Sequence, residues 1–143
     1  SQRPPGGMPW LRYYVRAPYL WLIVSVALLA IAETSASRPG LAAAARHALA
    51  TGFLATMLVG MGLRMILAFE GRRVIWQGGP WSVFVTLTLG TTLRVGAQAI
   101  EHLRLTAVGG GIQALAIWLF VFLMLSSRPI TMPRSGIGRV VSR

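Results

Sequence analysis

Two histidines and two arginines are the residues of this chain whose types and positions best suit a bound cofactor. His47 and His102 are the only histidines, and the chain has no cysteine. A neutral imidazole can ligate a metal ion, and a nearby arginine can pair with a carboxylate of a bound group. The lack of cysteine excludes disulfides, thiolate metal sites and iron–sulfur clusters. Arg64 and Arg94 both lie within apolar stretches, where arginine is costly unless it has a partner.

Each of these residues also has a structural interpretation. Arg94 is expected either to pair with Glu33 or Glu101, or to contact a cofactor carboxylate or another subunit. Arg64 lies about a turn inside the end of its apolar stretch, so it can reach the interface without any function. A single histidine beside small residues is more often an interhelical hydrogen-bond donor than a ligand. A row of methionines at four-residue spacing is predicted to fill packing gaps rather than bind metal: Met57, Met61 and Met65.

Four long apolar stretches must position these side chains. They cover residues 17–36, 43–69, 81–100 and 108–126. A bilayer core requires about 20 apolar residues as a helix, and lipid offers no hydrogen-bond partners to open strands. The pattern therefore predicts an all-α, polytopic integral membrane four-helix bundle, flanked by basic segments at 1–16 and 127–143.

Composition agrees with a membrane protein. Hydrophobic residues make up 55% and charged residues 12%, against about 25% charged in soluble domains. The net charge of +11 comes from arginine alone, and these arginines flank apolar spans, so we expect lipid and not nucleic acid as the partner. Nine arginines fall in the two termini and the middle loop and three near the other two loops, which predicts cytoplasmic termini.

Small residues at four-residue spacing mark two predicted packing faces, because they let helices approach closely in lipid. The first row is Ala48, Gly52, Thr56 and Gly60, and the second is Ser82, Thr86 and Gly90. The second row continues to Arg94, Gln98 and His102. Four ionisable residues are expected near the outer face: Glu33, His47, Glu101 and His102. The three glycines at 109–111 are expected to form a turn that opens the fourth helix.

The run from His47 to Arg72 resembles the NnrS family of bacterial membrane proteins. The similar segments are His47-Ala-Leu-Ala-Thr-Gly52, then Met57, Met61 and Arg64, and then Glu70-Gly71-Arg72. The resemblance continues through Leu93-Arg94-Val95, Trp118, Arg128-Pro129-Ile130 and Pro133-Arg134. It covers only the carboxy-terminal four helices of that family, which predicts either a fragment of a longer protein or a short relative. Phe69 stands where the family has a second histidine.

The resemblance implies a haem-associated protein of the bacterial inner membrane, linked to denitrification and nitric oxide, in a family described as containing haem and copper. It carries His47 over as a possible metal ligand, whereas His102 is added from its predicted position alone. Arg94 and Arg64 are the candidate partners of haem propionates.

Three functions remain open. The first is the haem-associated protein, not catalytic alone. The second is a structural or accessory transmembrane subunit that packs helices and lipids, with other membrane subunits or missing upstream helices as partners. The third is quinone or lipid binding along an aromatic segment, which an interfacial belt also explains: Trp10, Tyr13, Tyr14, Tyr19 and Trp21. An enzyme acting alone is not expected, since no nucleophile–base pair is recognisable and no catalytic residue is assigned.

Overall fold

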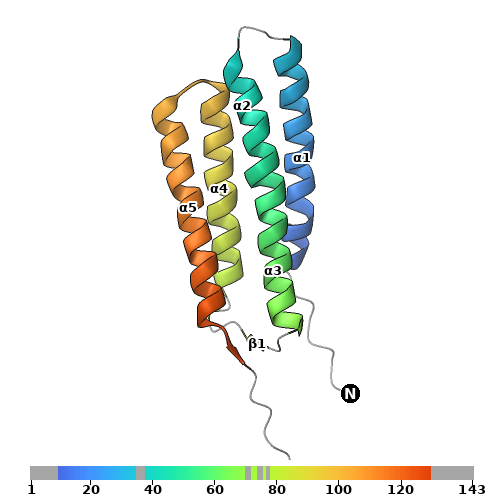
Figure 1. Cartoon of the computed structure of the whole chain (residues 1–143), viewed down its shortest axis with the longest axis vertical. Coiled ribbons are helices and arrows are strands. Elements are labelled where there is room, and N and C mark those ends of the chain that lie inside the picture. Colours follow the sequence, from blue (N-terminus) through green and yellow to red (C-terminus); the bar gives the residue numbers. More distant parts are fainter. Residues whose placement is uncertain (1–9, 35–37, 70–71, 74–75, 77, 130–143) are drawn as a thin grey trace, which may run out of the picture.

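A computed structural model shows four helical rods packed side by side (Figure 1). It describes residues 10–34, 38–69, 72–73, 76 and 78–129. The first rod is α1 (Leu11–Thr34), and the second joins α2 (Pro39–His47), the π-helical segment η1 (Ala48–Ala55) and α3 (Thr56–Phe69). The third and fourth rods are α4 (Gly79–Ala99) and α5 (Leu103–Ser126).

The two ends of the bundle differ in their connections. At one end, called here the terminal end, α1 begins and α5 ends (Figure 1). There the two-residue strands β1 (Arg72–Arg73) and β2 (Arg128–Pro129) pair antiparallel. At the other end, called the loop end, α1 connects to α2 and α4 connects to α5. Consecutive rods therefore run in opposite directions.

Three of the described helical segments are long and apolar enough to cross a membrane: Leu11–Thr34, Pro39–Ile66 and Leu103–Ser126. The predicted all-helical architecture with four rods is confirmed, apart from the short strand pair. The third rod, α4, does not belong to this set although the sequence pattern predicted a span there. It carries five Ser and Thr residues, more than any other rod, together with Arg94 and Gln98, and these polar side chains lower its mean hydropathy.

All four rods begin earlier than the hydropathy pattern indicates, and the difference is largest for α1 and α5. α1 begins at Leu11 rather than at residue 17, because Tyr14 turns inward and the arginines on either side of it stay exposed. α5 begins at Leu103 rather than at residue 108. The prediction that glycines 109–111 open this helix is therefore wrong: they lie within it, and Gly109 is buried against α4.

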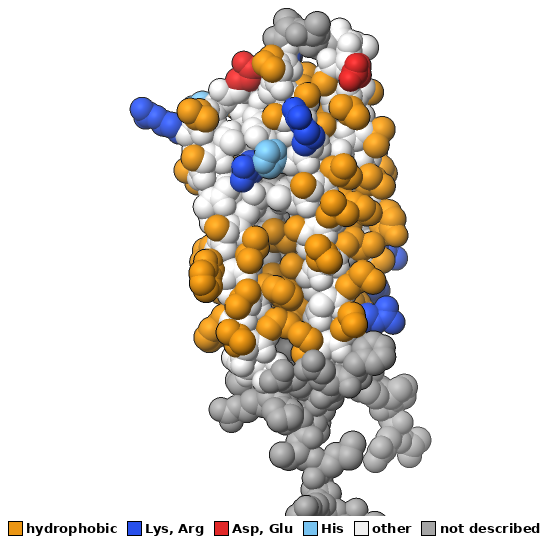
Figure 2. Space-filling view, in the orientation of Figure 1, with side chains coloured by type: hydrophobic (Ala, Val, Ile, Leu, Met, Phe, Trp, Pro, Cys, Tyr) orange, Lys and Arg blue, Asp and Glu red, His pale blue; other side chains and the backbone are white. Residues whose placement is uncertain are grey.

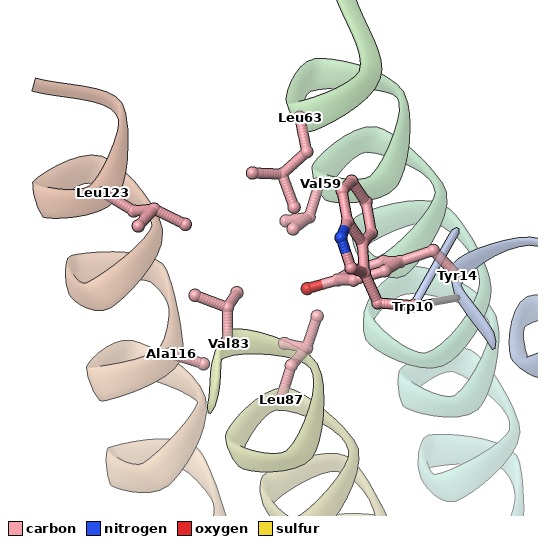
Figure 3. Packing of buried hydrophobic residues seen from close by; sticks show 8 residues of the cluster. All are labelled: Trp10, Tyr14, Val59, Leu63, Val83, Leu87, Ala116 and Leu123. Atoms are coloured by element: carbon pink, nitrogen blue, oxygen red, sulfur yellow. The ribbon is translucent and has the colours of Figure 1, made fainter. Parts of the chain in front are cut away.

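Bulky side chains fill the half of the bundle nearer the terminal end. Figure 3 shows how this cluster gathers side chains from every rod: Trp10, Tyr14, Val59, Leu63, Val83, Leu87, Ala116 and Leu123. The Tyr14 hydroxyl donates a hydrogen bond of 2.8 Å to the Pro80 carbonyl at the start of α4. Trp10 and Tyr14 thus belong to the core, whereas Tyr13 and Tyr19 are about half exposed, so the predicted aromatic segment does not form one surface.

Small residues pack the half nearer the loop end. Ala44 and Ala48 are fully buried against Val95 of α4. A Cβ added to Gly52 would overlap the Trp21 ring of α1. The row of small residues continues into the other half, where a Cβ added to Gly60 would lie 2.8 Å from Tyr14 Cβ. The first row of small residues therefore lies where α1 crosses the second rod, because only small side chains allow these helices to approach so closely.

Candidate functional site

A buried glutamine joins three rods in the half of the bundle nearer the loop end. Gln113 of α5 is only 5% exposed. Its Nε2 donates to Thr51 Oγ1 of η1 at 3.0 Å and to Thr91 Oγ1 of α4 at 3.1 Å, and its Oε1 accepts from Arg94 Nη1 at 3.3 Å. We call these four residues the polar cluster. Every hydrogen-bonding atom of the Gln113 amide is used, as buried polar groups require.

Glycines allow the backbones to close around the polar cluster. A Cβ added to Gly90 would lie 2.9 Å from the Gln113 backbone nitrogen, and one added to Gly109 would lie 2.8 Å from the Arg94 backbone nitrogen. A Cβ at Gly110 would lie 2.9 Å from Arg94 Nη1. The glycines that were expected to form a turn instead bring α5 close to the guanidinium.

Arg94 has no acidic partner among the described residues. Its hydrogen bond goes to the neutral Gln113, while its Nε is buried without a partner. Glu101 does not turn toward Arg94: it has a φ of 57° at the end of α4, and its carboxylate accepts a 3.4 Å hydrogen bond from the backbone nitrogen of Gly40. The expected pairing of Arg94 with an acid is therefore not found with either of the acids that the structure describes, Glu33 and Glu101. Such an arginine in apolar surroundings favours an anionic group from outside the chain.

His47 lies one helical turn before Thr51 on the second rod, where η1 begins. Its Nδ1 is 3.0 Å from the Ala43 carbonyl oxygen. Because a carbonyl oxygen only accepts, Nδ1 carries the proton in this contact, and in the neutral ring the lone pair is then on Nε2. The side chain is half-buried. This is the tautomer in which a helical histidine can bind a metal through Nε2.

His102 has the opposite tautomer. It caps the start of α5, and its Nδ1 accepts a 3.3 Å hydrogen bond from the Leu105 backbone nitrogen. Nε2 therefore carries the proton while the cap is formed. His102 is exposed and follows Glu101, whose carboxylate contacts Gly40 at the start of the second rod. His47 lies seven residues after Gly40 on that rod, roughly 10 Å further along by helical rise. The structure does not bring the two histidines together.

Arg64 lies far from the polar cluster. It follows His47 on the same rod by about 25 Å of helical rise, so the two residues cannot serve one cofactor. Arg64 is exposed at the end of a shallow groove of about 50 Å³ between α1 and α3. Met57 is half-buried in this groove, whereas Met61 and Met65 are 61% and 58% exposed.

The predicted packing rows lie mostly at helix contacts. Ala48, Gly52, Thr56 and Gly60 are all buried. In α4, Gly90 is buried, while Ser82 and Thr86 are partly buried and Ser82 Oγ donates to the Gly78 carbonyl at 3.2 Å. Gln98 Oε1 is buried without a partner one turn beyond Arg94, and His102 leaves the row because α4 ends at Ala99.

Sequence reasoning missed Gln113, Thr51 and Thr91. A glutamine within a long apolar helix is itself a signal, because buried amides in such helices bond to neighbouring helices. The threonines carry no such signal, since each also donates to its own helix, Thr51 to the His47 carbonyl at 2.7 Å and Thr91 to the Leu87 carbonyl at 2.8 Å. Their role depends on which helix faces them.

Side chains alone do not form a metal site in the part of the chain that is described, where no three His, Cys, Asp or Glu residues come close enough to hold an ion. A haem differs, because the porphyrin supplies four ligands and the protein needs to add only one or two. Figure 2 shows a histidine side chain with arginine side chains on either side, on the half of the face nearer the loop end.

Comparison with known proteins gives a family without an assigned activity. No curated protein and no solved structure matches the chain at a significant level. The model of one family, described as "Domain of unknown function (DUF8744)", matches residues 5–129. That match covers all four rods, and the chain belongs to this DUF8744 family.

Proposed function

We propose that the chain is an integral membrane protein that binds haem through His47 and takes part in nitrogen-oxide metabolism, as an NnrS-like protein that is not catalytic alone. The observation that carries the proposal is the hydrogen bond from His47 Nδ1 to the Ala43 carbonyl, at 3.0 Å. It fixes the ring orientation and leaves the Nε2 lone pair free. The resemblance of the segment that begins at His47 supports the same assignment.

The residues around His47 would fit a haem held by one imidazole. Thr51, one turn after His47, and Arg94 both bond to Gln113, so His47 and Arg94 approach the same part of the bundle. Gln113 orients the Arg94 guanidinium, whose Nε has no partner, and a propionate carboxylate is an anion that arginine pairs with well. Bound haem would supply the iron that interacts with nitric oxide.

His47 and Arg94 have different roles in this proposal. His47 would hold the iron, while Arg94 would offset the negative charge of a propionate in an apolar environment. Because His47 is half-buried rather than enclosed, a neighbouring chain or lipid would cover the rest of the group. Copper bound by side chains alone is not part of the proposal, since the described residues hold no group of ligands for it.

Membrane insertion with cytoplasmic termini is part of the same proposal. Three of the described helical segments have the length and composition for it, and the arginines of both terminal segments favour this orientation by the positive-inside rule. The bacterial inner membrane is the location that follows.

A second function is favoured by one specific observation. The polar cluster is closed within the chain, because Gln113 uses all its hydrogen-bonding atoms on Thr51, Thr91 and Arg94. Such a cluster can serve packing alone. In that case the chain is a structural or accessory subunit of a larger membrane complex without its own cofactor.

Absorption spectra of haem-reconstituted protein, with a pyridine hemochrome assay, separate the two functions. The wild type is compared with His47→Ala and with His102→Ala as the matched control. Binding through His47 predicts a Soret band that His47→Ala loses and His102→Ala keeps. No Soret band in the wild type, or an equal band in all three proteins, would leave the structural subunit as the better account.

A further inference from the structure

The groove at Arg64 is the second feature of this bundle that suits a ligand. It lies between α1 and α3, on the opposite half of the second rod from His47. Its walls are apolar and include Leu11, Val15, Met57 and Met61, and Gly60 and Tyr14 form its floor. Among the described residues, Arg64 is the only charged one that lines it.

The position of Arg64 fits a lipid headgroup. Along α3, Arg64 is the lining residue nearest the terminal end, and it lies roughly 7.5 Å of helical rise before Phe69, where the helix ends. The apolar part of the groove extends from there toward Met57, roughly 10 Å further into the bundle. A charged group near the interface and an apolar slot directed inward match the two parts of a phospholipid.

The charges of the described residues around the groove have one sign. Arg12 and Arg16 are exposed on the same part of α1 that lines it. Glu33 and Glu101, the two acids that the structure describes, both lie at the loop end. Anionic headgroups are attracted to such basic positions near a membrane surface, by about 1 kcal/mol for each arginine. A zwitterionic lipid, whose headgroup has no net charge, would gain less from them.

The groove suits a slender apolar group. Its volume of about 50 Å³ accommodates part of one acyl chain. Exposed Met61 and Met65 extend the wall onto the outer face, and flexible methionine side chains adapt to an irregular apolar partner.

We propose that the groove between α1 and α3 binds one anionic phospholipid, with the phosphate at Arg64 and an acyl chain along Met57 and Met61. This inference rests on the membrane location in the proposed function but not on haem. Arg64 lies about 25 Å of helical rise from His47, too far to pair with a propionate of a haem bound there. Binding of a lipid phosphate gives it a different role.

Native mass spectrometry of the detergent-solubilised full chain tests the proposal with phosphatidylglycerol and phosphatidylcholine as probes. Arg64→Gln should weaken phosphatidylglycerol binding about fivefold and weaken phosphatidylcholine binding less, because the choline charge offsets that of its phosphate. Arg104→Gln, which removes an exposed arginine of the loop end, is the matched control and should leave both unchanged. Met61→Trp, on an exposed position, should block the slot and weaken phosphatidylglycerol binding although Arg64 remains.

Two results would overturn the proposal. If Arg64→Gln and Arg104→Gln weaken phosphatidylglycerol binding equally, the lipid is held by general charge attraction and not at a specific site. Unchanged binding in Met61→Trp would show that no acyl chain occupies the groove. Circular dichroism checks that each variant folds, and His47→Ala should bind phosphatidylglycerol as the wild type does, so failure of the haem proposal remains separate. Extraction of the protein from membranes by alkaline carbonate would instead refute the membrane location itself.

Discussion

The adjacent threonines of α4 allow a sharp test of the polar cluster. Both hydroxyls donate to a carbonyl one turn earlier at 2.8 Å, Thr91 to Leu87 and Thr92 to Thr88. Only Thr91 is fully buried, and only Thr91 accepts from Gln113 Nε2. Valine resembles threonine in shape and lacks the hydroxyl. Thr91→Val and Thr92→Val therefore differ mainly in one hydrogen bond between helices.

The structure gives the expected size of that difference. Gln113 Nε2 has two hydrogens, and Thr51 and Thr91 accept one each. Thr91→Val leaves one of them without an acceptor in a side chain that is 5% exposed. Bonds between transmembrane helices contribute about 0.6 kcal/mol on average and up to about 1.7 kcal/mol, and a buried donor without a partner costs about 1–3 kcal/mol. We expect Thr91→Val to lower the free energy of unfolding by about 1–2 kcal/mol and Thr92→Val by less than about 0.5 kcal/mol.

Unfolding in mixed micelles at rising SDS fraction, followed by helical circular dichroism, measures both free energies. The same pair is then measured with Gln113→Leu as the background. Without the glutamine amide, Thr91→Val should cost nothing further, because the bond it removes is already gone. If Thr91→Val costs the same in both backgrounds, or no more than Thr92→Val, the polar cluster does not stabilise the bundle in the way argued above.

Two more matched pairs test the packing by the same unfolding measurement. Gly52→Ala should lower the free energy of unfolding by about 1–3 kcal/mol because its Cβ overlaps the Trp21 ring. Gly111→Ala should cause no loss, since nothing lies within 4 Å of a Cβ there, and equal effects would contradict the close approach of α1. Tyr14→Phe should lose about 1 kcal/mol with its hydrogen bond to α4. Tyr13→Phe, on a side chain that is 50% exposed, should change nothing, and a loss there as large as that of Tyr14→Phe would count against the argument.

The apolar pattern predicted the rods well because length and hydropathy are properties of each helix alone. It placed the starts of α1 and α5 too late, since a hydropathy pattern excludes Arg12 and Arg16 although both can stay exposed on a helix whose Tyr14 is buried. The row that contains Gly52 was also visible in the sequence. The sequence did not show which helix packs against that row, because nothing in the spacing identifies Trp21 of α1 as the neighbour of Gly52.

The candidate site was less predictable because its contacts depend on how the helix ends are built. Arg94 and Glu101 lie on nearly one face of an ideal helix, which suggested an ion pair. In the structure α4 ends at Ala99 and Glu101 takes a positive φ. That conformation lets the backbone nitrogen of His102 donate a hydrogen bond of 2.8 Å to the Ala97 carbonyl. This bond is typical of the Schellman motif, which ends many helices. The carboxylate is thereby directed to α2, and Arg94 is left with Gln113.

The polar cluster also explains how a bundle with so much apolar surface holds one register. Lipid tails are as apolar as leucine, so burying leucine against another helix gives little preference for one alignment in a membrane. Gln113 needs acceptors from η1 and α4 at the same time, and it must accept from Arg94 as well. Sliding α5 by one turn, about 5.4 Å, would break all three bonds and would move Gly109 away from the Arg94 backbone. The register of α5 and the position of the Arg94 charge are therefore fixed by the same contacts, which hold that charge at one level of the bundle for the anionic group that His47 and Arg94 are proposed to bind.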